Sequence, residues 1–273
     1  MRHNETVMLP INELMDFEAQ PYKVLDDDSM YELAESIKNV GVLVPIIVRT
    51  QNRRYEIISG HRRKRACVIA GIDTIPATVM ELDDDEAAIM LVDSNLQREN
   101  LLPSEKAYAY KLKLDAIKHQ GSKNEWEDDT LTESADYVGL DTNKSGRQIR
   151  RYIRLTELIY PLLDKVDVKI IPVMAGAEIS HLNVKLQVTL NDQIEFFDCK
   201  LNIKQAEQLK KLYMDGKLDE RTIKTILTTQ DKNTMVSIDC TKLRKYFPKH
   251  YTAKQCETAM WEILDDWFAR QSA

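Results

Sequence analysis

Strand and helix signals alternate over the first hundred residues of this chain, and secure strand signals then stop. β-Branched runs bounded by turn residues are typical of strands, whereas apolar residues spaced three to four positions apart are typical of helices. The alternation predicts a mixed α/β domain at the N-terminus. The expected elements are a short strand at Met8–Ile11, a helix from Met30 to Val40 with Ser29 as N-cap, strands at Val42–Arg49 and Tyr55–Ile58, a helix at His61–Ala70, a strand at Ile75–Glu81 and a helix at Asp84–Leu96.

Helix signals dominate after Pro103. The expected elements are a helix at Ser104–Lys118, a helix-turn-helix within Leu131–Asp164, two segments that are ambiguous between strand and helix at Val184–Leu190 and Gln193–Phe197, two helices within residues 202–229, a short strand at Val236–Asp239 and an amphipathic helix at Thr252–Arg270.

These elements predict an α+β fold class with three parts. A small mixed α/β domain occupies residues 1–102, and an all-helical helix-turn-helix domain occupies residues 103–165. A mainly helical region follows at residues 166–273. The last predicted helix has an apolar face that includes Met260 and Trp267, and the pair Trp261 and Trp267 indicates a core or a dimer surface, with core packing as the favoured explanation of the stripe. We assign this last region to dimerisation or partner binding.

The balance of charge excludes a protein that binds polyanions indiscriminately. The chain has 38 Lys and Arg against 44 Asp and Glu, a formal net charge of −6. The four cysteines lack CxxC spacing, so neither a zinc site nor a redox motif is indicated. The N-terminus has no signal-peptide pattern, and the longest apolar run, residues 40–48, is much shorter than the roughly 20 residues of a membrane helix. We expect a cytoplasmic protein without membrane contact, in which local basic patches make any nucleic-acid contacts.

The first such patch, Ser59–Arg65, follows a strand directly and places four positive charges at the start of a helix. Unpaired N–H groups and the helix dipole favour anions there, and Gly60 would let a phosphate approach the backbone. Arg62 and Arg63 can bind phosphate oxygens bidentately. The pattern indicates a site for a phosphate chain. The alternative is a solvated basic helix face that pairs with nearby acids.

A second polar cluster lies at Asp93–Leu101. Ser94, Asn95, Gln97 and Arg98 supply hydroxyl, amide and guanidinium groups within a short stretch. Such groups can hold phosphate oxygens and a hydrated divalent ion. An ordinary helix end is the alternative, because Asn and Asp favour helix termini.

The order of the two clusters resembles the ParB/RepB family of DNA partition proteins. A GxRR box follows a strand, and an NLQREN box then leads into a Pro-Ser-Glu-x-x-x-Ala-Tyr helix. Gly41–Arg49 is similar to the GVLQPIVVR strand of that family, and Gln20-Pro21-Tyr22 to the end of its NPxQPR segment. The resemblance runs from about Leu9 to Leu163.

In that family the N-terminal domain binds CTP with Mg²⁺. The resemblance implies that the first box contacts the triphosphate, that the second box completes the pocket, and that Asn95 lies beside the metal. The implied cofactor contacts are Gly60, His61, Arg62, Arg63, Ser94, Asn95, Gln97 and Arg98.

Three positions depart from the family pattern. His61 stands where many members carry Glu, and Val44 where Gln is common. Ser94 stands where the family has a Glu implicated in hydrolysis. A serine cannot act as a carboxylate base at neutral pH. The departures leave CTP binding as the expectation and weaken the expectation of CTPase activity.

A third cluster, Lys144–Arg154, has five basic residues and no acid. Ile149 and Ile153 form an apolar back, so this stretch is typical of the recognition helix of a helix-turn-helix. The final Arg151–Leu155 matches the RYxRL string of the ParB family. The alternative is a solvated basic helix that pairs with the acidic loop Glu125–Asp129. The expected DNA contacts are Lys144, Ser145, Arg147, Gln148, Arg150, Arg151 and Arg154.

These features indicate a sequence-specific DNA-binding partition protein for plasmid, mobile-element or chromosome segregation. By resemblance, a homodimer would bind a palindromic site in double-stranded DNA on the nucleoid or a plasmid, close as a CTP-dependent clamp, and act with a ParA-like ATPase. The alternative is a transcriptional regulator with a degenerate nucleotide pocket. An enzyme is a third interpretation. Redox chemistry would need a reactive cysteine near the first basic box, but Cys67 is expected to be packed. A nuclease would need a cluster of carboxylates for metal ions, but Asp83–Glu86 is interpreted as a helix start.

Overall fold

The computed structural model describes residues 6–98, 101–122, 135, 138, 144–228, 246–247, 251–252, 255–256 and 258–263. The chain divides into two compact units, Met1–Thr228 and Thr229–Ala273. The first unit carries all the elements described below. The expected first helix of the helix-turn-helix, the strand at Val236–Asp239 and much of the helix at Thr252–Arg270 fall outside the described residues.

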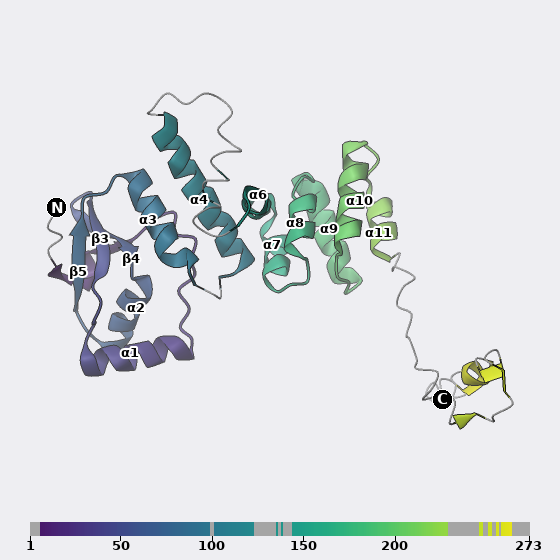
Figure 1. The fold of residues 1–273 in the computed structure, drawn as a ribbon, viewed down its shortest axis with the longest axis horizontal. Helices are drawn as coiled ribbons and strands as arrows, with labels where there is room; N and C mark the ends of the chain where they lie inside the picture. The colour runs from purple at the N-terminus through teal and green to yellow at the C-terminus, as the bar shows by residue number, and fades with distance from the viewer. Residues whose placement is uncertain are drawn as a thin grey trace. The chain divides into compact units, whose positions relative to one another are not determined.

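A five-stranded mixed sheet forms the N-terminal part (Figure 1). Its strand order is β1-β5-β3-β4-β2, with β3 parallel to β5, β2 parallel to β4, and antiparallel pairs β1/β5 and β3/β4. Asn52 and Arg53 both adopt positive φ in the turn between β3 and β4, as a tight two-residue hairpin turn requires. The strands are β1 (Thr6–Pro10), β2 (Leu14–Asp16), β3 (Ile46–Gln51), β4 (Arg54–Ser59) and β5 (Thr74–Met80).

Helices cover both faces of this sheet. Helices α1 (Asp28–Val40) and α2 (His61–Ala70) share a core with Ile57, whereas α3 (Asp84–Leu96) and α4 (Pro103–Ser122) share another with Ile58. Successive side chains of a strand point to opposite faces, so these two neighbours in β4 contribute to different cores. The expected mixed α/β domain is confirmed.

Several element ends differ from those expected from the sequence. Helix α1 is capped by Asp27, whose carboxylate accepts a hydrogen bond from the Met30 N–H at 2.9 Å, so Ser29 is not the N-cap. Strand β3 begins at Ile46 rather than at Val42, after Gly41 has ended α1 with a φ of 83°. The two ambiguous segments after residue 184 form one helix, α9.

The rest of the first unit is helical. Its core cluster extends from Ala107 to Leu227, so the helices before and after residue 165, the boundary expected from the sequence, pack together. Among the described residues, no helix is long and apolar enough to cross a membrane. The helical elements are α6 (Gly146–Arg154), η2 (Leu155–Glu157), α7 (Tyr160–Asp167), α8 (Val173–Ile179), α9 (Val184–Phe196), α10 (Ile203–Met214) and α11 (Glu220–Thr228).

Candidate functional site

A pocket of about 150 Å³ lies where the start of α2 faces the end of α3. The two polar boxes found in the sequence therefore meet in space. A third segment, just before α1, closes the pocket. Residues lining it are Gln20, Tyr22, Lys23, Val24, Ser59, Gly60, His61, Arg62, Arg63, Ser94, Asn95 and Arg98.

Gly60 makes the tight passage from β4 into α2. Its φ is 113°, a conformation that residues with a side chain rarely adopt. A Cβ atom at this position would lie 2.5 Å from Cγ2 of Ile46. Only glycine fits here without displacing the strand, and its presence leaves the first N–H groups of α2 at the pocket wall.

The four cations of the first box divide into two pairs. Lys64 and Arg65 are ion-paired with Asp16 at 2.9 Å and Asp26 at 2.5 Å. Arg62 and Arg63 line the pocket instead. Lys64 and Arg65 thus fit the alternative of a solvated basic helix face that pairs with nearby acids. Arg62 and Arg63 provide positive charge to the pocket.

Neutral oxygens make the short contacts of both pocket arginines. Arg62 Nη2 donates to the Ser29 hydroxyl at 2.7 Å, and the nearest carboxylate oxygen, of Asp27, lies 3.9 Å away. Arg63 Nη1 donates to the Pro45 carbonyl at 2.6 Å and to the carbonyl of the preceding residue. Burial lowers the pKa of Arg63, because desolvation disfavours the charged guanidinium. These acceptors orient the two side chains but leave much of their charge uncompensated, so an anion in the pocket would interact with both.

The end of α3 supplies the second wall. The Ser94 hydroxyl donates to the Leu91 carbonyl at 3.0 Å, and Asn95 Nδ2 donates to the same carbonyl at 2.8 Å and to the Ser94 hydroxyl at 3.2 Å. Arg98 follows the helix and also faces the pocket. Gln97, the C-cap residue of α3, is exposed and is not among the lining residues. Seven of the eight expected cofactor contacts thus share one pocket.

The third wall, Gln20–Val24, was not among the expected site residues. Gln20 Nε2 donates to the Tyr22 carbonyl at 2.9 Å, and the Lys23 N–H donates to the Glu105 carboxylate at 2.9 Å. Burial is the main cause that raises the pKa of Tyr22 above its usual range. The QPY motif marked this segment in the sequence, but only the fold places it opposite the two boxes.

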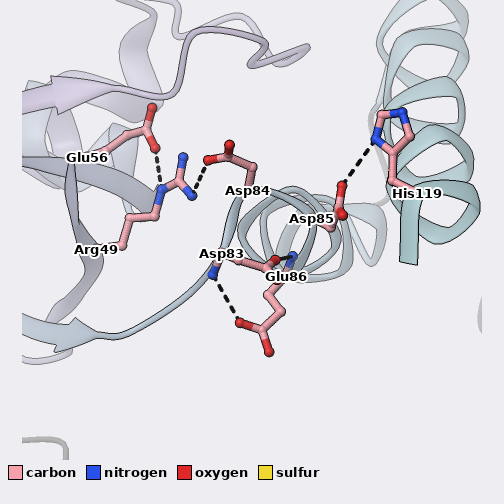
Figure 2. A network of polar contacts seen from close by, with 7 residues as sticks. All are labelled: Arg49, Glu56, Asp83, Asp84, Asp85, Glu86 and His119. Atoms are coloured by element: carbon pink, nitrogen blue, oxygen red, sulfur yellow. Dashed lines mark hydrogen bonds and ion pairs between the residues drawn. The ribbon is translucent and has the colours of Figure 1, made fainter. Parts of the chain in front are cut away.

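A polar network at the opposite end of α3 fixes that helix to the sheet (Figure 2). Arg49 Nε donates to Glu56 Oε2 at 2.6 Å, and Arg49 Nη1 lies 2.7 Å from Asp84 Oδ1. Asp83 and Glu86 form a capping box at the start of the helix. These acids therefore start a helix, as expected, and Asp84 also pairs with Arg49. No group of three metal-binding side chains occurs in the described part of the chain.

Cys67, the cysteine nearest to the first basic box, lies on α2 and is fully buried in the core. Burial also raises the pKa of its thiol, which disfavours the reactive thiolate. The side chain packs, as expected from the sequence.

Helix α6 carries the third basic cluster. Ser145 and Gln148 form a capping box, and Ile149 is fully buried against Tyr110 and Val138 of its own small core. Arg147, Gln148 and Arg150 are exposed on the other side, and Lys144 and Arg151 are partly exposed. The apolar back and polar front expected of this helix are therefore present.

Arg154 differs from the other expected DNA contacts. Its guanidinium donates to the Ser180 hydroxyl and to the Ser180 carbonyl, both at 3.2 Å, and lies 3.2 Å from His181 Nδ1. These contacts join α6 to the end of α8. These polar contacts of Arg154 therefore hold two helices of the helical domain together.

Comparison with known proteins identifies the family. Residues 1–96 match the model of the ParB N-terminal domain. The chain is 33% identical over 217 residues to the nucleoid occlusion protein of Halalkalibacterium halodurans, covering 79% of this chain and 71% of that protein. It is 32% identical over 208 residues to the chromosome-partitioning protein Spo0J of Thermus thermophilus, covering 75% and 70%.

Among solved structures, the C-terminally truncated ParB of Caulobacter crescentus complexed to the centromeric parS site is 24% identical. That match has a TM-score of 0.45 and covers 75% of this chain and 98% of that chain. The extent and identity of the sequence relatives, together with the matched N-terminal domain, show that this chain belongs to the ParB family of partition proteins.

Proposed function

We propose that this chain binds a DNA site through α6 and binds CTP in the pocket between α2 and α3, as a partition protein that segregates a chromosome, plasmid or mobile element. The observation that carries the proposal is the pocket itself. Two boxes that lie far apart in sequence meet there, at a helix N-terminus beside four cationic side chains. Those side chains are Lys23, Arg62, Arg63 and Arg98.

The proposed ligand follows from the chemistry of these walls. A triphosphate carries several negative charges, and helix N-termini and arginines are favourable partners for them. Asn95 and the Gln20 side chain add amide groups that can read a base or a ribose. The choice of CTP among nucleotides rests on membership of the ParB family.

Magnesium has no resident site among these residues. Asn95 offers one neutral oxygen, and the described lining has no carboxylate, whereas Mg²⁺ is usually bound through one or two carboxylates together with substrate phosphates. The Asn95 amide is also held by Leu91 and Ser94. We therefore assign magnesium to this pocket only as an ion carried by the phosphates of the nucleotide, beside Asn95.

Hydrolysis is not part of the proposal. The Ser94 hydroxyl donates back to its own helix and cannot replace a carboxylate base. We propose that nucleotide binding, rather than turnover, is the function of this pocket.

The proposed DNA surface consists of Lys144, Ser145, Arg147, Gln148, Arg150 and Arg151. Each phosphate contact removed should lower the salt dependence of binding by about 0.9 in the slope of log K against log salt. Arg154 stays outside this surface because its guanidinium is bound within the protein. A homodimer on a palindromic site, a ParA-like ATPase partner and a location on the nucleoid or a plasmid in the cytoplasm complete the proposal, all by family membership.

The nucleotide proposal can be tested by titrating CTP, ATP and GTP against the full chain with Mg²⁺. We expect binding selective for CTP and a loss of at least tenfold in affinity for Arg62→Ala. Arg65→Ala is the matched control, because Arg65 lies on the same helix but pairs with Asp26 outside the pocket. Equal effects of the two substitutions, or no preference for CTP, would contradict the proposal.

The DNA proposal can be tested with duplexes selected from a random pool. We expect Arg147→Ala and Arg150→Ala each to weaken binding and reduce the salt slope, whereas Arg221→Ala on α11, an exposed arginine away from α6, should leave both unchanged. An unchanged salt slope for all three variants would exclude α6 as the DNA surface. Retained DNA binding by a chain that binds no nucleotide would favour the transcriptional regulator instead.

A further inference from the structure

The imidazole of His61 has an unusual place in the pocket. It is the first residue of α2 and lies between Gly60 and Arg62 in the pocket wall. Its Nε2 atom is buried from solvent and has no hydrogen-bond partner among the described residues. A buried polar nitrogen without a partner costs free energy, which an oxygen atom of a bound ligand would recover.

The ring is uncharged at neutral pH when the pocket holds no ligand. Burial lowers the pKa of His61 to about 4, while Asp16 acts to raise it and Lys64 and Arg98 act to lower it further. Asp16 is itself ion-paired with Lys64 at 2.9 Å, which limits its effect on the ring. The other ionisable side chains that line the pocket are Tyr22, Lys23, Arg62 and Arg63.

We propose that a nucleoside triphosphate binds this pocket together with a proton, which His61 takes up. The proposal rests on the nucleotide-binding function proposed above. A triphosphate reverses the sign of the local field, and a negative charge within about 4–6 Å favours the charged form of an imidazole. The imidazolium has a donor on both nitrogens, so Nε2 gains an anionic acceptor in place of its missing partner.

The sign of the pH dependence follows from this linkage. The pKa of His61 is higher in the complex than in the free protein, so affinity increases as the pH falls through the value in the complex. The increase ends below the pKa of the free protein, about 4. One linked proton changes the affinity by at most tenfold per pH unit.

The test is calorimetric titration of CTP with Mg²⁺ into the full chain and into His61→Asn at pH 6, 7 and 8. Asparagine keeps a polar side chain but does not titrate. Phosphate groups themselves titrate near pH 6, so the informative quantity is the ratio of the two dissociation constants at each pH. We expect the ratio of variant to wild type to grow at least threefold between pH 8 and pH 6. A constant ratio would overturn the proton linkage while leaving nucleotide binding intact.

A second measurement does not depend on the folding of the variant. The Cε1–H resonance of the His61 ring is followed by NMR through a pH titration of the wild type, with and without CTP. We expect the midpoint to move up by more than two pH units from about 4 when CTP is bound, as the threefold change between pH 8 and pH 6 requires, and an unmoved midpoint would overturn the proposal. If the wild type bound no CTP at any pH, the nucleotide-binding function would itself be refuted, and the linkage with it.

Discussion

Arg49 connects the sheet to α3, and its removal should destabilise the N-terminal domain more than most single substitutions. Its side chain is 5% exposed, and that of its partner Glu56 is 10% exposed. Arg49→Met removes the guanidinium but keeps much of the side-chain volume. Because the Glu56 carboxylate would then lie buried without a counter-charge, we expect the free energy of unfolding to fall by about 3–5 kcal/mol.

The second ion pair of Arg49 should contribute much less. The Asp84 side chain is 82% exposed, and solvent screens such a pair, so Asp84→Asn should cost no more than about 1 kcal/mol. The double variant Arg49→Met/Glu56→Leu should regain most of the lost stability, because replacing a buried ion pair by apolar side chains of similar size is often close to neutral.

Urea unfolding of the full chain, followed by far-ultraviolet circular dichroism, measures these differences. The expected order of stability is wild type, then Asp84→Asn and the double variant near it, and Arg49→Met well below. A loss under about 1 kcal/mol for Arg49→Met, or a double variant as unstable as the single one, would refute the argument that an uncompensated Glu56 carboxylate causes the loss.

Three further substitutions test the parts around the pocket and α6. Gly60→Ala should lower CTP affinity and reduce stability by about 1–3 kcal/mol, measured by calorimetry and urea unfolding, because the new Cβ would meet Ile46 at 2.5 Å and φ is 113°; wild-type behaviour would contradict the tight passage from β4 into α2. Glu105→Ala should weaken CTP binding severalfold, because the Lys23 N–H loses its carboxylate acceptor and the third pocket wall loosens; unchanged affinity would show that this wall is not needed. Arg154→Ala should lower the thermal midpoint but leave the salt slope of DNA binding unchanged, and a slope that fell by about 0.9 would return this residue to the DNA surface.

Much of the fold could be predicted where local chemistry determines a boundary. Helix α3 begins and ends at the expected residues, and its start is fixed locally by the capping box of Asp83 and Glu86. Helix α2 likewise ends before Gly71, which adopts the left-handed conformation typical of a helix end. Local signals of this kind involve few residues and do not depend on the rest of the chain.

Boundaries that depend on tertiary packing were harder to predict. The apolar run from Val42 onward resembles a strand, but Leu43 and Val44 are exposed in a loop whose carbonyl oxygens accept from Arg63. The segment from Val184 to Phe196 is helical because Leu190 and Ile194 pack into the helical core, although its β-branched residues also suit a strand.

The site shows the same distinction between local and tertiary information. The two boxes were recognisable because each concentrates polar groups in a few residues. The Gln20–Val24 wall is held at the pocket by contacts with residues far along the chain: the Lys23 N–H donates to Glu105, and the Tyr22 hydroxyl donates to the Val92 carbonyl. The role of Arg154 was similarly hidden, since Ser180 lies far along the chain.

The arrangement of charge in the first box explains how an acidic chain can hold an anion-binding pocket. Neighbouring helix positions are rotated by about 100°, so four consecutive cations cannot all face the same way. Lys64 and Arg65 point to Asp16 and Asp26, where acids of the body neutralise them. Arg62 and Arg63 donate to neutral oxygens of Ser29 and of residues 44–45, and the Asp27 carboxylate lies 3.9 Å from Arg62, farther than the acids that pair with Lys64 and Arg65. The net charge of −6 thus excludes indiscriminate attraction of polyanions, while the choice of neutral or charged partners for each side chain decides where a phosphate can bind.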